Sequence, residues 1–173
     1  VMRSLPDRYS PIMNSLSSSW QHVHDRIVAA CQASGRPIDS VQLLAVSKTF
    51  PADQVAAVAA FGQRDFGENY VQEGVDKIAA LKSVAGLVWH CIGPLQSNKT
   101  RQVAEHFDWV HSVDRLKIAQ RLSEQRPAHL PPLQVCLQVN IDGGPTKAGV
   151  APLEALALAK AVIALPRVSL RGI

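Results

Sequence analysis

A lysine at the end of an apolar segment is the residue of this sequence best suited to covalent chemistry. Lys48 follows the apolar residues 43–46 and Ser47. An amine that is partly withdrawn from water loses its proton more readily, and the free amine can attack a carbonyl carbon to form a Schiff base. A lysine at a strand end can also extend its charged group into water. The residue types alone leave both interpretations open.

Other polar residues occupy comparable positions in later apolar segments. They lie near or just beyond the end of the segment and are Asn69, His90 and Asn140. The carboxyl ends of parallel strands meet at one edge of an α/β fold, where loops and helix N-termini converge on ligands. Polarity also begins at the strand ends of any soluble protein. Hydrogen-bonding or reactive types in nearly every unit nevertheless favour a binding site.

Two loops carry basic residues that could bind an anion. We expect Ser97 to cap a helix whose first turn carries Lys99, and the free N–H groups at a helix start favour an anion. Gly143 and Gly144 predict a mobile loop from which Lys147 could reach an anion. A capped helix with solvated basic residues and a flexible surface loop are the simpler alternatives, and both stay open.

Composition and spacing exclude several functional classes. The 18 basic and 14 acidic residues are scattered and aromatic residues make up 5% of the chain, so no nucleic-acid surface is predicted. The apolar runs, such as 55–61 and 161–165, are far shorter than the roughly 20 residues that span a membrane. No set of His, Cys and carboxylate residues has the spacing of a metal site. Three widely spaced cysteines exclude a disulfide framework and fit a reducing, cytoplasmic compartment.

Short apolar segments alternate with helical segments after an N-terminal amphipathic helix that ends at Gly35. The expected strands are 41–46, 65–67, 87–92, 109–111, 133–139 and 168–173. The expected helices between them are 52–61, 71–81, 97–107, 114–126 and 152–165. Such alternation predicts an α/β fold with a parallel sheet. An open doubly wound sheet and a closed eight-unit barrel compete. The usual dinucleotide-binding glycines are absent, and the units are too few to close a barrel.

Several motifs of this sequence resemble those of the pyridoxal-phosphate homeostasis proteins, the YggS/PROSC type. In the order of that family they are LAVSKT at 44–49, FGENY at 66–70, WHCIGPLQSNK at 89–99, VHSVD at 110–114, VNI at 139–141 and LRG at 170–172. The Ile-Gly-x-Leu-Gln-x-Asn-Lys run that begins at Ile92 is highly specific. The resemblance extends from Leu16 to the last residue.

The resemblance implies a (β/α)8 TIM-type barrel like the N-terminal domain of alanine racemase, of which about six units lie in the single domain 1–173. It implies that Lys48 holds pyridoxal phosphate as an internal aldimine, with Asn69, His90 and Asn140 lining the ring. The implied function is to buffer or deliver this cofactor, in vitamin B6 and amino-acid homeostasis, as a carrier rather than a catalyst. The implied partners are pyridoxal-phosphate-dependent apoenzymes, and we expect a monomer.

Two other functions remain as alternatives. One is a fold-type III racemase or decarboxylase that uses the same cofactor, and the other is a non-catalytic module that binds a protein partner. We also expect residues 1–12 to be disordered. By resemblance, the last barrel units, with the residues that bind the phosphate group and face the pyridine nitrogen, are expected beyond Ile173.

Overall fold

The computed structural model describes residues 10–173, with side chains from residue 13 onward. Helices and strands alternate along the chain. The elements are α1 (Ser10–Ala33), the 3-10 helix η1 (Ile38–Ser40), β1 (Ala45–Val46), α2 (Ala52–Ala60), β2 (Asp65–Glu68), α3 (Val71–Ala80), β3 (Val88–Cys91), the 3-10 helix η2 (Ser97–Lys99), α4 (Thr100–His106), β4 (Trp109–Val113), α5 (Leu116–Gln125), β5 (Leu133–Leu137), α6 (Pro152–Ile163) and β6 (Val168–Gly172). The predicted disorder concerns residues 1–12, of which 1–9 lie outside the described residues and 10–12 begin α1.

The sheet decides between the two predicted architectures. All neighbouring strands run parallel, and their order in space is the order in the sequence, β1-β2-β3-β4-β5-β6. A doubly wound sheet reverses its strand order part-way, whereas a barrel adds each strand beside the last. The order therefore favours the barrel architecture. Within the described residues the sheet does not close, and β1 and β6 are its edges.

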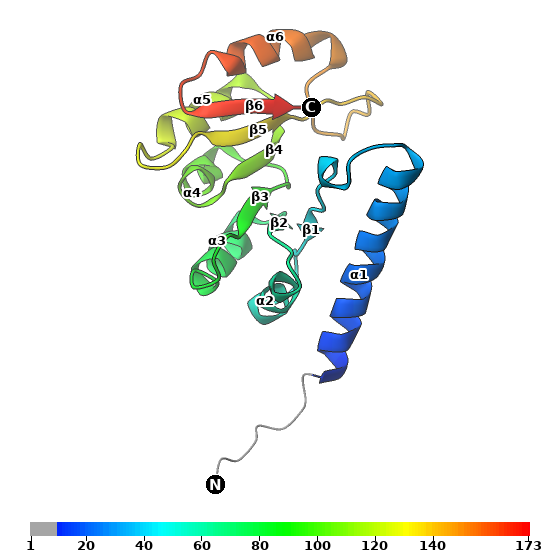
Figure 1. The fold of residues 1–173 in the computed structure, drawn as a ribbon. Helices are drawn as coiled ribbons and strands as arrows, with labels where there is room; N and C mark the ends of the chain where they lie inside the picture. The colour runs from blue at the N-terminus through cyan, green and yellow to red at the C-terminus, as the bar shows by residue number, and fades with distance from the viewer. Residues whose placement is uncertain (1–9) are drawn as a thin grey trace.

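Helices cover one face of this sheet. Figure 1 shows α2 to α6 following one another along that face, while the long helix α1 lies beside the β1 edge. The burial of β5 has the matching alternation, because Leu133, Val135 and Leu137 are buried whereas Gln134 and Cys136 are half-buried. We call the side opposite α2–α6 the inner face of the sheet.

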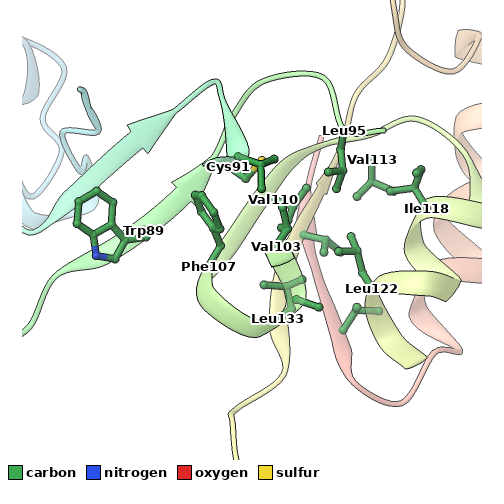
Figure 2. Packing of buried hydrophobic residues seen from close by; sticks show 14 of the residues in the cluster. Trp89, Cys91, Leu95, Val103, Phe107, Val110, Val113, Ile118, Leu122 and Leu133 are labelled. Carbon is green, nitrogen blue, oxygen red and sulfur yellow. The ribbon is translucent and has the colours of Figure 1, made fainter. Parts of the chain in front are cut away.

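Apolar side chains fill the space between the sheet and its helices. Val110 and Leu133 from the strands pack with Ile118 and Leu122 from α5, and all four are fully buried (Figure 2). Figure 2 also shows Phe107, which follows α4, within the same cluster. The amphipathic spacing in the sequence predicts this packing, since residues three or four apart share one helix face.

The strand predicted at 41–46 is much shorter in the structure. Only Ala45 and Val46 pair with β2, and the residues before them follow η1. β2 begins at Asp65, one residue before its first pair with β1, which joins Phe66 to Ala45. Residues 41–43 therefore lie beyond the start of β2 and have no residue of that strand opposite them.

Ser97 does not cap a helix, contrary to the prediction. It begins η2, and neither η2 nor α4 has a side-chain cap hydrogen bond. The carbonyl of Ser97 instead accepts hydrogen bonds from Thr100 Oγ1 at 2.9 Å and from Arg121 Nε at 3.1 Å. These two side chains draw the segment into a tight turn before α4 begins. Anion binding at this helix start, one of the two alternatives left open by the sequence, stays a prediction.

No helix among the described residues combines the length and the apolar character that crossing a membrane would require.

Candidate functional site

Lys48 lies in the turn directly beyond β1 and is exposed. β1 pairs with β2 so that Val46 lies opposite Gly67. Ser47 is buried on the helix side, where its hydroxyl donates to Glu68 Oε1 at 2.6 Å. If the alternation of β1 continues for one more residue, the side chain of Lys48 is expected on the inner face.

The strand register places further residues in a row with Lys48. If the pairings of β1 to β4 are continued by two residues, Asn69 lies beside Lys48, followed by Ile92 and His111. This extrapolated register puts Lys48 and Asn69 at neighbouring positions, and their shared contact with a ligand stays a prediction. His111 was not predicted as a site residue, although the sequence carries a signal for it, a polar side chain within an apolar strand.

His90 lies two residues before Ile92 on β3, in register with Gly67 and Trp109. Its side chain is buried and belongs to a chain of hydrogen bonds. Its Nε2 is 2.9 Å from Asp65 Oδ1, and its Nδ1 is 2.9 Å from His111 Nε2. Its ring stacks on Trp109 with a centroid separation of 5.4 Å. Neutral rings satisfy this chain when His90 donates to Asp65 and accepts from His111, an assignment that follows from the hydrogen-bond pattern.

Burial shifts the protonation of both histidines in the same direction. Burial lowers the pKa of His90 below its ordinary value, and the nearby Asp65 carboxylate opposes this only in part. Burial also lowers the pKa of His111, and the neighbouring His90 lowers it further. In the neutral chain, Nδ1 of His111 is an acceptor with no partner among the described side chains and backbone. It is the end of the chain that a ligand on the inner face can reach.

Asn140 uses its side chain to organise the loop that follows β5. Its Oδ1 accepts from the backbone N–H of Gly143 at 3.1 Å, and its Nδ2 donates to the carbonyl of Gly144 at 3.1 Å and to that of Lys147 at 3.4 Å. A side chain with these bonds shapes its own loop. Contact between Asn140 and a ligand ring stays a prediction.

A buried ionic network surrounds the backbone on both sides of Lys48, and the sequence analysis missed it. It consists of Glu68 from β2 and of Glu73 and Lys77 from α3. The Glu73–Lys77 spacing was its only local signal, and this spacing is equally typical of a solvated pair on a helix surface. The backbone carbonyl that Lys77 also bonds belongs to Ser47, which is 30 residues away from Lys77 in the sequence.

Gly93 lets the chain leave β3 directly against Asn69. A Cβ atom at Gly93 would overlap the backbone oxygen of Asn69 and would lie 2.8 Å from its Cα. Backbone atoms cannot move aside as the end of a long side chain can, so only glycine fits here without a shift. This close packing fixes the position of Asn69 at the rim of the inner face.

Comparison with known proteins identifies the family. Residues 21–173 match the family model described as alanine racemase, N-terminal domain. The chain is 59% identical over 161 residues to the pyridoxal phosphate homeostasis protein of Pseudomonas aeruginosa, which covers 93% of this chain and 70% of that protein. The chain belongs to the pyridoxal phosphate homeostasis protein family. The Escherichia coli member of this family is 55% identical over 163 residues, with the same coverage of 93% and 70%.

Solved structures show the same fold. PipY of Synechococcus elongatus without PLP has a TM-score of 0.74 at 42% identity, over 86% of this chain and 68% of PipY. PipY with PLP bound has a TM-score of 0.71 at 40% identity, over 87% and 68%. Alanine racemase from E. faecalis shows the fold alone, with a TM-score of 0.64 at 18% identity over 89% and 41%. The predicted family and the predicted barrel-type fold are confirmed.

The described inner face of this family member fits an aldehyde cofactor by its own chemistry. Lys48 is an exposed primary amine, Asn69 offers an amide in the neighbouring register position, and His111 offers a free ring nitrogen in the same row. An amine can attack the aldehyde carbon, and an amide and an imidazole can bind polar ring substituents.

Proposed function

We propose that this chain binds pyridoxal phosphate through Lys48 and holds it for delivery rather than for turnover. The observation that supports the proposal is the position of Lys48, an exposed amine directly beyond β1, at the register position next to Asn69 when the β1–β2 pairing is continued. The 59% identity to a protein named for pyridoxal phosphate homeostasis and the PLP-bound structure of PipY support the same cofactor.

Pyridoxal phosphate, when bound, supplies an aldehyde carbon to which a neutral lysine amine adds, with loss of the carbonyl oxygen as water. The exposed side chain of Lys48 leaves its amine accessible to a ligand from solvent. Asn69 would orient the ring, and His111 would accept a hydrogen bond through Nδ1. His90 would act through His111, because both of its own ring nitrogens are engaged.

Storage fits the protonation chemistry of the described inner face. A racemase or decarboxylase needs an acid or base poised over the ring. Both ring nitrogens of His90 are engaged, and burial lowers the pKa of His90 and His111, so near neutral pH neither ring is a cationic acid. The described inner face then offers one free base, Nδ1 of His111, and no histidine acid to complete a two-base racemase pair. The proposal therefore includes cytoplasmic hand-over of the cofactor to pyridoxal-phosphate-dependent apoenzymes by a monomeric carrier.

The test is the absorbance of the protein with cofactor, followed by borohydride reduction and peptide mapping. We expect wild-type protein to show a visible band, and the reduced adduct to lie on the peptide that contains Lys48. Lys48→Ala should abolish both signals, whereas Lys82→Ala, which removes another exposed lysine, should retain them. A band that survives Lys48→Ala would contradict the proposal.

The racemase alternative is tested on the same samples. Incubation with a single enantiomer of an amino acid, followed by chiral analysis, should show no Lys48-dependent conversion. Conversion that is lost in Lys48→Ala would favour the enzyme over the carrier.

A further inference from the structure

We infer that Lys77, Glu73 and Glu68 are positioning residues that hold the backbone of Lys48 in the conformation that captures the cofactor. The inference rests on the proposed function, because it concerns the way in which Lys48 meets an aldehyde. None of the three is expected to touch the ligand, since Lys77 and Glu68 are buried on the helix side of the sheet.

Lys77 is the centre of this network. Its Nζ donates to the backbone carbonyl of Ser47 at 2.6 Å, to Glu68 Oε1 at 2.8 Å and to Glu73 Oε1 at 2.7 Å. An ammonium group has no further N–H to donate, so its hydrogen-bonding capacity is used completely. The ammonium therefore links α3 and β2 to the residue immediately before Lys48.

The carboxylates hold the residues on both sides of Lys48. Glu68 Oε1 accepts the hydroxyl of Ser47 at 2.6 Å, and Glu73 Oε1 accepts the backbone N–H of Thr49 at 2.6 Å. The Lys77 ammonium and the Thr49 N–H together lower the pKa of Glu73 below its ordinary value, and the hydrogen bond from Lys77 is the largest cause. Glu73 thus stays ionised and keeps both donors.

Thr49 has a backbone conformation that needs such support. Its φ angle is 68°, and among the described non-glycine residues it has the one positive value. The left-handed region is unfavourable for a β-branched residue, so it persists only where other contacts hold it. The hydrogen bond from Phe50 N–H to the Ser47 carbonyl, 3.1 Å long, closes the same turn. This turn makes the chain leave β1 directly after Lys48.

The pairing with β2 holds little of this segment. Among the described residues, β1 pairs only with β2, and only through Ala45 and Val46. The network therefore supplies directional bonds at the point where the backbone ladder ends. A role in stability alone explains it poorly, because buried ions are costly to remove from water and Glu68 Oε2 is buried without a hydrogen-bond partner.

The inference is tested by removing the carboxylate of Glu73 while the buried Lys77–Glu68 pair stays in place. Glu73 is suitable because its side chain is 29% exposed, so Glu73→Ala leaves Lys77 bonded to Glu68. Glu73→Gln is the conservative variant, because the one oxygen that accepts from both Thr49 and Lys77 can be replaced by an amide oxygen. Asp76→Ala is the matched control. It removes an exposed carboxylate from the same helix, and that carboxylate bonds only to Gln72.

Two measurements are made on each variant. The first is amide hydrogen exchange at Thr49 in cofactor-free protein, and the second is the dissociation constant for pyridoxal phosphate from the absorbance titration. We expect Glu73→Ala to lose protection at Thr49 and to weaken binding at least about tenfold, since it removes charge-assisted hydrogen bonds. Glu73→Gln and Asp76→Ala should stay within about threefold of wild type.

The outcomes separate this inference from the proposed function. If Glu73→Ala binds pyridoxal phosphate as tightly as wild type, the positioning role alone is overturned. The same holds if Asp76→Ala weakens binding as much as Glu73→Ala does. Wild-type protein that takes up no pyridoxal phosphate would overturn both. Loss of Thr49 protection and of affinity in Glu73→Ala, with recovery of both in Glu73→Gln, would support the inference.

Discussion

The interior beneath β1 and β2 differs in kind from the interior beneath β4 and β5. Around β4 and β5, the side chains that fill the space between strands and helices are mainly apolar, and Val110, Leu122 and Leu133 are fully buried. Around β1 and β2, the corresponding space holds apolar side chains such as Phe66 and Val55 together with Glu68 and Lys77, which are both buried and ion-paired. The same layer of the fold thus gains a buried ion pair at this end of the sheet.

This difference separates stability from positioning. Apolar burial is not directional and scales with area, so the β4–β5 interior holds the fold together without specifying where a single backbone atom must lie. Hydrogen bonds to charged groups are directional and short, so the β1–β2 interior specifies the turn around Lys48. We therefore expect changes in the two regions to have different consequences.

The largest effect on stability is expected in the apolar interior. Leu122→Ala should lower the free energy of unfolding by about 2–5 kcal/mol, because it removes a fully buried side chain and leaves a cavity. Urea denaturation measures this change, and Leu153→Ala, at a leucine that is 97% exposed, is the control. Affinity of the folded variant for pyridoxal phosphate should match wild type. A parallel loss of affinity would break the distinction between the two regions.

Gly93→Ala should lower the stability less than Leu122→Ala does, and it should also weaken the binding of pyridoxal phosphate. The added methyl group overlaps the backbone of Asn69, and overpacking of this kind lowers the free energy of unfolding by about 1–3 kcal/mol. Because the strain falls on Asn69, binding of pyridoxal phosphate should weaken as well. Gly172→Ala is the control, since a Cβ at that position meets nothing within 4 Å. Full retention of affinity in a destabilised Gly93→Ala would remove Asn69 from the proposed site.

The smallest effect is expected from the histidines of the inner face. Burial lowers the pKa of His90 and His111 in the folded protein, so below about pH 6.5 the unfolded chain binds more protons than the folded chain. The contribution of the neutral histidines to the free energy of unfolding is fully present above that pH and is lost as the pH falls. The free energy of unfolding then changes by at most about 1.4 kcal/mol per pH unit for each histidine.

Urea unfolding from about pH 7.5 to about pH 5.5 measures this dependence. His111→Gln should reduce the slope, because one titrating group is removed while the glutamine amide can still donate to His90. An identical slope in His111→Gln would show that the coupled chain Asp65–His90–His111 does not govern stability in this range.

Much of the fold followed from periodicity and from chain-breaking residues. The segments at 65–67 and 109–111 mark β2 and β4, and the helix predicted from residue 152 is α6, which begins there with Pro152. Such patterns are local, so residues close in sequence determine them. The cap predicted at Ser97 was wrong because Ser97 is already the first residue of η2 and Gln96 takes the position before it.

For the candidate site, the sequence by itself determined which amine is available, because Lys48 stands in a specific motif directly after an apolar segment. Only the tertiary structure decided what surrounds it. The strand register set Asn69 and His111 in its row, and α3 carried Lys77 to the carbonyl of Ser47. Contacts between residues tens of positions apart depend on strand pairing and helix packing, and neither is encoded in any short stretch of the chain.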